Sequence, residues 1–190
     1  MMKKKMYCLS IFILCICFCC KASDDVKKPA DTFLHAMISG DYVKMASFIN
    51  DKEGIRLSPI PFIYPDFQRK FVKNEIANCE SDTALYDWFT DDPDNPDELT
   101  IKDFIQRNYR CEAERFSKDS INTFITSTGY DDSRRYNNFY EIYPKCKFVE
   151  YYASPSGTYE EMDWFSVCII LQAIDGDYYV VAVTCNYQGI

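Results

Sequence analysis

Apolar residues recur at helical spacing in the segment that starts at residue 30. In the stretch "ADTFLHAMIS" they lie on one face, at Phe33, Leu34, Met37 and Ile38. Pro29 suits the first turn of this helix, and Gly40 suits its end. Asp41 can then cap a second helix, "YVKMASFIN", whose apolar side holds Val43, Ala46 and Ile49. The pattern predicts a helical hairpin.

The middle of the chain mixes short apolar runs with proline and acidic residues. The stretch "GIRLSPIPFIYPD" is typical of a strand, but Pro59, Pro61 and Pro65 confine it to a sheet edge or an irregular arm. A short helix ("VKNEIANC") and a strand ("TALYDWF") are predicted next, and residues 90–98 form an acidic connecting loop. Thr100 and Asp103 have the spacing of a capping box, which predicts a helix over "IKDFIQRNYR".

From Ile121 onward the pattern becomes that of strands, which we predict over residues 121–127, 145–153, 162–173 and 178–187. Asp175-Gly176 is a strong signal for a two-residue type I′ hairpin. With these two residues as the loop, Ile174 faces Asp177 and Cys168 faces Val183. Cys185 then lies diagonal to Cys168, about 7 Å away between Cα atoms, so we expect no disulfide between them.

Both faces of this predicted hairpin are apolar. One face carries Trp164, Cys168, Ile170, Tyr179, Val181, Val183 and Tyr187, and the other carries Phe165, Val167, Ile169, Leu171, Val180 and Ala182. A sheet that is apolar on both sides needs a cover on each. We expect the chain's own helices on one face and a partner subunit or a second layer on the other.

The N-terminus has the pattern of an export signal. Lys3, Lys4 and Lys5 precede the uncharged run Met6–Cys20, which is about 22 Å long as a helix and too short for a hydrocarbon core of ~30 Å. We predict a lipoprotein signal peptide over residues 1–19, lipid attachment at Cys20, a polar tether over 20–28 and a single α+β domain over 29–190. Cleavage before Ser23 with soluble secretion, or retention as an uncleaved anchor, are the alternatives.

This predicts a bacterial cell-envelope protein in the outer membrane, exposed at the surface, with a secreted or periplasmic protein as the alternative. Loss of three lysines with the signal leaves 18 basic against 29 acidic residues, a net charge of −11. Such a surface repels nucleic acids and anionic membranes, so no nucleic acid is expected as a partner. It permits a basic protein partner.

Cysteine and histidine usage limits the chemistry. The cysteines of the mature body are Cys79, Cys111, Cys146, Cys168 and Cys185, an odd number whose pairing the sequence does not determine. The single histidine, His35, falls within the first predicted helix. A zinc site or a histidine-activated nucleophile therefore has almost nothing to be built from, and no cofactor is expected.

The order of elements resembles the NTF2-like (cystatin-like) α+β cone, in which a curved antiparallel sheet wraps around helices to form a pocket. The motifs "GIRLSP", "KFVEYY", "YEEMDW" and "DYYVVAV" also resemble an uncharacterised family of exported bacterial proteins, which carry a "YEGMDW" signature and end in a "WYLVGI" strand followed by His-Asp. Tyr159, Met162, Asp163 and Trp164 match that signature. The chain departs from the family at Phe165 and Cys168, where basic residues are expected, and at Cys185-Asn186, which replaces His-Asp. The resemblance implies no known activity.

Tryptophan–aspartate pairs are the candidate binding residues. Asp87-Trp88 and Asp163-Trp164 each join an apolar ring to a polar anchor, as at a pocket mouth, and Tyr187 shares the strand face of Trp164. Ordinary core packing is the alternative for these aromatic residues.

We therefore expect a non-enzymatic envelope lipoprotein that binds a small apolar ligand or a protein. The protein could be an identical subunit on the sheet face, or a basic toxin or hydrolase that this chain neutralises as an inhibitor or immunity protein. A pocket enzyme that uses carboxylates, such as Glu161 with Asp163, is the second alternative.

Overall fold

The computed structural model describes residues 25–88, 97–110, 113–125, 137–158 and 163–187. The predicted signal peptide over 1–19, Cys20, most of the acidic loop and the signature residues Tyr159 and Met162 lie outside these ranges, as do Cys111 and Glu161. Within them, no helix is long and apolar enough to span a membrane.

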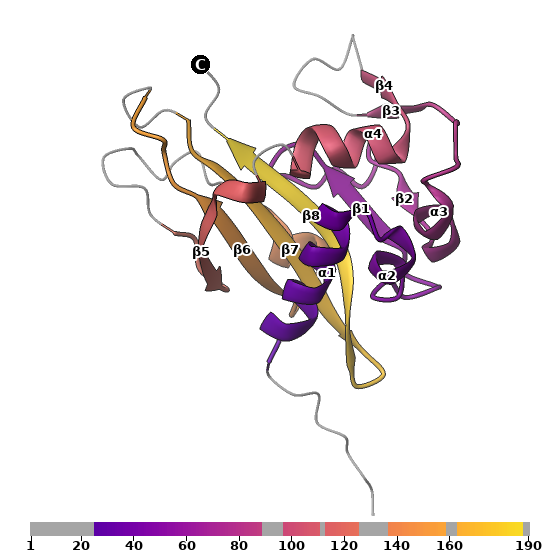
Figure 1. The fold of residues 1–190 in the computed structure, drawn as a ribbon. Helices are drawn as coiled ribbons and strands as arrows, with labels where there is room; N and C mark the ends of the chain where they lie inside the picture. The colour runs from indigo at the N-terminus through magenta and orange to yellow at the C-terminus, as the bar shows by residue number, and fades with distance from the viewer. Residues whose placement is uncertain (1–24, 89–96, 111–112, 126–136, 159–162, 188–190) are drawn as a thin grey trace, which may run out of the picture.

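A six-stranded sheet forms the centre of the molecule (Figure 1). Its order is β2-β1-β8-β7-β6-β5, and all neighbours are antiparallel except β1 and β8, which are parallel. The strands are β1 Ile55–Ser58, β2 Lys70–Phe71, β5 Phe116–Ile121, β6 Lys147–Ala153, β7 Phe165–Ile174 and β8 Asp177–Tyr187. β3 Tyr86–Trp88 and β4 Asp97–Leu99 pair separately. The predicted α+β class and mainly antiparallel, curved sheet are confirmed.

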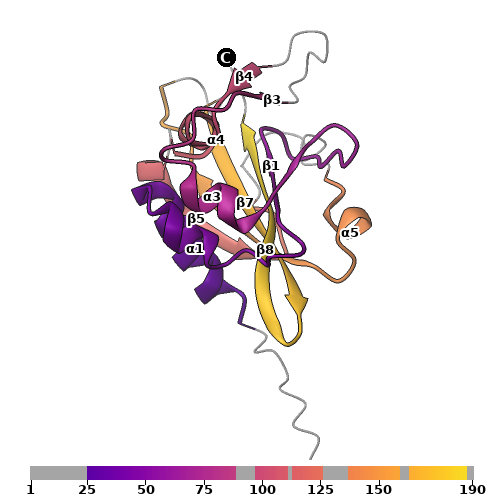
Figure 2. The same ribbon diagram turned by 90° about the vertical axis from the view of Figure 1, so that its right-hand side faces the viewer.

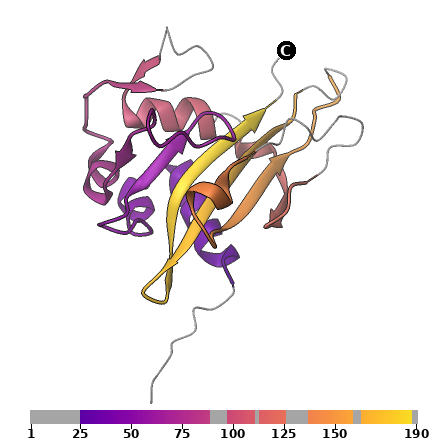
Figure 3. The ribbon, with the colours of Figure 1, turned by 180° about the vertical axis from the view of Figure 1, so that it is seen from behind.

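The helices lie on both sides of this sheet (Figure 2). They are α1 Lys27–Ser39, α2 Tyr42–Ala46, α3 Lys73–Asn78, α4 Ile101–Ile105 and α5 Phe139–Ile142. A π-helical turn, Gln106–Arg110, continues α4. α1 packs on one face of the sheet and α5 on the other, as the opposite views in Figures 1 and 3 show.

The predicted helical hairpin is present, with two corrections to its bounds. Gly40 ends α1 in the left-handed conformation (φ 77°), and the Asp41 carboxylate accepts the Lys44 N–H at 2.9 Å. α1 begins at Lys27, inside the predicted tether, because Val26 is buried and Lys27 forms an ion pair with Asp31.

α2 is shorter than predicted and turns a different face to the core. It ends at Ala46 rather than continuing to residue 50. Val43, predicted on the apolar side, is 70% exposed, whereas Tyr42 and Met45 are buried. Beyond the helix, the Phe48 carbonyl accepts the Val180 N–H of β8 at 2.9 Å. This bond to the sheet takes the place of a further helical hydrogen bond.

The β7–β8 hairpin has the predicted turn but not the predicted register along its whole length. Asp175 and Gly176 have positive φ angles of 52° and 96°, and Ile174 faces Asp177. A bulge between Ile170 and Leu171 shifts the pairing by one residue, so that Cys168 faces Thr184 instead of Val183.

This single-residue shift moves side chains to the other face of the sheet. Val183 joins the cluster on the α1 face, and Ala182 joins the opposite cluster, the reverse of the predicted assignment. Cys185 likewise lies on the α1 face and Cys168 on the other. The two thiols therefore do not face each other, in line with the expectation that they are not bonded.

The outer edge strand also differs from its prediction. The strand expected over residues 121–127 is instead β5, which ends at Ile121. Asn122 adopts φ 53°, and its side-chain oxygen accepts the Phe148 N–H at 2.9 Å, which ends the pairing with β6. The sequence "FSKDSI" of β5 shows no strand alternation because most of its residues are exposed at the sheet edge.

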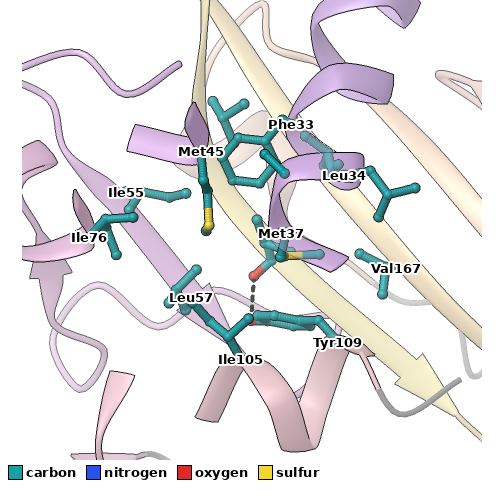
Figure 4. Packing of buried hydrophobic residues seen from close by; sticks show 14 of the residues in the cluster. Phe33, Leu34, Met37, Met45, Ile55, Leu57, Ile76, Ile105, Tyr109 and Val167 are labelled. Atoms are coloured by element: carbon teal, nitrogen blue, oxygen red, sulfur yellow. Dashed lines mark hydrogen bonds between the residues drawn. The ribbon is translucent and has the colours of Figure 1, made fainter. Parts of the chain in front are cut away.

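Two apolar clusters confirm that the sheet is buried on both faces. The first joins α1, α2 and α4 to the sheet, and Figure 4 shows Phe33, Met37 and Met45 converging with Leu57 and Val167. The second contains Ile63, Phe139, Tyr143, Cys146, Phe148, Cys168, Ile170, Val181 and Ala182. The chain itself therefore covers this second face around α5; dimerisation through the sheet face stays a prediction.

Tyr109 links the two parallel strands from inside the first cluster. Its hydroxyl lies 2.9 Å from the Ser58 carbonyl of β1 and 3.1 Å from the Val183 carbonyl of β8. Complete burial raises the pKa of Tyr109 well above its ordinary value, so the phenol remains a neutral donor. Its single hydroxyl hydrogen serves these two carbonyls, which belong to fully buried residues.

Replacing Tyr109 by Phe is expected to lower the free energy of unfolding by about 1–2 kcal/mol, because it removes a buried hydrogen bond to the strand carbonyls. Tyr178→Phe is the control, since the Tyr178 ring is only partly buried and packs beneath Lys147. Urea unfolding of both variants measures the difference. Equal stabilities would show that the Tyr109 hydroxyl does not support the strand junction.

Gly54→Ala is expected to be among the most destabilising small substitutions. Gly54 has φ +64°, and a Cβ there would lie 2.6 Å from the Phe71 carbonyl oxygen of β2. Gly157→Ala is the matched control, because φ is +81° and nothing lies within 4 Å of its Cβ. Both changes carry the left-handed strain of ~1–3 kcal/mol. Thermal unfolding should show an additional loss of about 2 kcal/mol for Gly54→Ala, and equal losses would contradict the contact.

Candidate functional site

An open groove of about 760 Å³ lies on the second face of the sheet, beside α5. Figure 3 shows α5 in front of the sheet on this side. The groove is lined by Glu53, Arg56, Pro65, Lys70, Glu141, Ile142, Tyr143, Gln172, Ala173, Ile174 and Asp175. Its volume is in the range of ligand-binding clefts, and its lining mixes charges of both signs with a few apolar side chains.

Arg56 lines this groove from β1. It lies in β1 with Lys70 and Ala182 as its Cα partners on either side. Ile55 and Leu57 point into the first cluster, so alternation turns Arg56 to the second face. The β1 position therefore brings a guanidinium to the margin of an apolar cluster.

The hydrogen bonding of Arg56 is incomplete. Its Nη1 donates to the Tyr143 hydroxyl at 3.1 Å, whereas Nε is buried with no acceptor. Among the ion pairs of the described residues, none joins a carboxylate to Arg56 within 4.0 Å. An arginine does not lose its charge, and a buried unsatisfied donor costs about 1–3 kcal/mol. The fold thus retains a cation that it does not neutralise by direct contact.

Tyr143 orients the arginine without neutralising it. The residue follows α5 directly and is 6% exposed. Its hydroxyl donates to the Val181 carbonyl at 3.2 Å, which leaves the oxygen lone pairs for Arg56. Burial raises the pKa of Tyr143, more than the neighbouring Arg56 lowers it, so the phenol stays uncharged.

The other charged side chains of the groove come from different elements of the fold. The Lys70 ammonium lies 3.4 Å from the Glu53 carboxylate, and both side chains are partly exposed. Glu141 of α5 and Asp175 of the hairpin turn are exposed, and within the described ranges neither belongs to an ion pair. The groove therefore offers a cation at Arg56, a paired Lys70 and Glu53, and anions from α5 and the hairpin.

Trp88, predicted at a pocket mouth, is instead packed in the first cluster. It is 5% exposed, and its ring stacks on Phe104 with centroids 3.5 Å apart. Its Nε1 donates to the Leu99 carbonyl at 2.9 Å. The preceding Asp87 is exposed and faces Glu98 across β3–β4. Trp88 therefore matches the alternative interpretation, core packing, and does not line a pocket mouth.

Trp164 lies on the other side of the sheet. It is 4% exposed and stacks with Tyr152 at 6.1 Å. Tyr152 follows Tyr151 of the first cluster, and alternation places it on the second face. The structure therefore does not bring Trp88 and Trp164 into one pocket. Tyr187, 58% exposed, ends β8 opposite Phe165.

Asp163 holds together the segment between β6 and β7 through hydrogen bonds. Its carboxylate accepts the Ser156 N–H at 3.0 Å and an Arg115 N–H at 3.3 Å. These bonds, the one from Ser156 first, lower the pKa of Asp163. Arg115 also donates to the carbonyls of Ser154 and Asp163. The carboxylate thus has structural partners, and its predicted partner in acid–base chemistry, Glu161, lies outside the described residues.

The remaining candidates for chemistry lie apart from each other. His35 is exposed on α1. Burial raises the pKa of the Cys79 thiol to about 12 and that of Cys146 to about 11, so neither is a ready nucleophile. Across the parts of the chain that the structure describes, no cluster of three or more histidine, cysteine or acidic residues could hold a metal ion.

Sequence reasoning missed both Arg56 and Tyr143. A signal for Arg56 was present, because it is the one charged residue between Gly54 and Asp66. No such signal existed for Tyr143, which is 87 residues away in the chain and meets Arg56 only through the fold.

Comparison with known proteins gives no family. No family model and no curated protein matches the chain. Among solved structures, a calcium/calmodulin dependent protein kinase II association domain from Xanthomonas campestris is similar over 83% of this chain and 81% of its own, with 7% identity and a TM-score of 0.30. A likeness this remote supports no argument about the fold or function of this chain.

Proposed function

We propose that this chain is a non-enzymatic cell-envelope lipoprotein whose single α+β domain binds a protein partner through the groove around Arg56. In this proposal residues 1–19 are removed, Cys20 carries the lipid, and the domain is NTF2-like, with the sheet curved around α1. The observation that carries the binding role is the open, mixed-charge groove with an arginine that has no carboxylate partner among the described residues.

The lining of the groove favours a protein over a small apolar ligand. Charged and amide side chains line much of it, and the tryptophans expected to line an apolar pocket are packed elsewhere. Protein interfaces tolerate such mixed charge and use it for orientation.

The overall charge favours a basic partner. With residues 1–19 removed, 18 basic and 29 acidic residues leave a net charge of −11, which gives long-range attraction to a cationic protein. This supports the version in which the lipoprotein neutralises a basic toxin or hydrolase as an inhibitor or immunity protein. A second copy of this chain is the alternative partner.

The partner can be tested with residues 24–190 exported through an oxidising compartment and measured by native mass spectrometry. We expect an additional protein or peptide mass that disappears on denaturation. A small apolar molecule in its place would favour the ligand alternative. A bare monomer at all concentrations would remove the support for a stably bound partner.

The anchor can be tested separately. Cys20→Ser is expected to move the protein from the membrane fraction to the soluble fraction, because the thiol is the proposed site of acylation. Cys19→Ser is the matched control and should leave the protein in the membrane. Continued membrane association of Cys20→Ser would contradict the lipoprotein proposal and indicate an uncleaved anchor.

A further inference from the structure

We infer that the groove recognises a free carboxylate on a peptide segment, and that Arg56 is the residue that binds it. The inference rests on the proposed function, since it names the chemical group through which the partner engages. It follows from the environment of Arg56 and from the charges around it.

The guanidinium has donors to spare. It carries five N–H donors, of which one on Nη1 binds Tyr143 and the one on Nε is buried without an acceptor. The remaining Nη donors are left for a ligand. The Tyr143 hydroxyl is held in turn by the Val181 carbonyl, so the arginine is fixed at one end by an uncharged partner. An orienting contact that leaves the charge intact is what a preorganised anion site requires.

The neighbouring charges select a single carboxylate over a phosphate. Glu141 and Asp175 also line the groove, and their charges oppose a dianion. A carboxylate carries one negative charge and matches the planar fork of an arginine. The same two acids can attract basic groups elsewhere on the ligand, so the groove suits a peptide that combines basic side chains with one carboxylate.

The neighbouring lysine does not replace Arg56 in this role. Lys70 lies next to Arg56 across β1–β2, but its ammonium is 3.4 Å from Glu53, which neutralises part of its charge. Lys70 is also exposed, and an exposed ammonium is strongly hydrated. Arg56, half-buried at the margin of the apolar cluster, binds with less competition from water.

The probe is a library of randomised pentapeptides with free C-terminal carboxylates, passed over immobilised protein (residues 24–190). The same library with amidated C-termini is the comparison. We expect at least tenfold greater retention of the free-carboxylate library. Arg56→Gln should abolish that difference, and Arg56→Lys should restore only part of it because the ammonium lacks the fork geometry.

Arg107→Gln is the matched control, because Arg107 pairs with Asp97 outside the groove. It should retain peptides as the unmodified protein does, and thermal unfolding verifies that every variant is folded. Equal retention of both libraries, no retention of either, or an unchanged difference in Arg56→Gln would each overturn the inference. A protein mass in the native spectrum together with any of these results would leave the proposed function standing without the carboxylate.

Discussion

Three central strands that are buried on both faces impose the constraint on which the rest of the structure depends. β6, β7 and β8 contribute buried side chains to both clusters, so water must be excluded from each side of the sheet. α1, α2 and α4 cover one side, and α5 with Ile63 covers the other. Each buried aliphatic or aromatic side chain contributes ~1.5–3 kcal/mol, so the fold loses much of its stability if either cover is missing.

The two covers also determine where buried polar groups find partners. On the first face, the Tyr109 hydroxyl reaches the carbonyls of Ser58 and Val183 where β1 and β8 run parallel. On the second face, the Tyr143 hydroxyl reaches the Val181 carbonyl. Tyr109 lies in a helical turn and Tyr143 directly follows α5. Both phenols donate to strand backbone, because an unpaired buried carbonyl would be costly.

The groove exists because the second cover is short. α5 spans only Phe139–Ile142, and beyond Tyr143 the sheet margin is open to solvent. Arg56 stands at that boundary, where its stem borders the apolar cluster and its guanidinium meets one hydroxyl. α5 and Tyr143 thus both cover the second cluster and line the proposed binding site. The stability of the fold and the geometry of the site therefore depend on the same segment.

Local signals in the sequence determined the helical hairpin at Gly40 and Asp41, the Asp175-Gly176 turn and a sheet with two apolar faces. Each of these features depends on local properties: the φ/ψ range of one residue, a hydrogen bond to the nearby backbone, or a short apolar repeat. Such features form whatever the rest of the chain packs against. Only the tertiary structure decided the bulge between Ile170 and Leu171, the core position of Trp88 and the contact of Arg56 with Tyr143. These depend on which distant segments pack together: a one-residue shift reverses a strand's faces, and an aromatic ring fits a core or a pocket equally well until its neighbours are known.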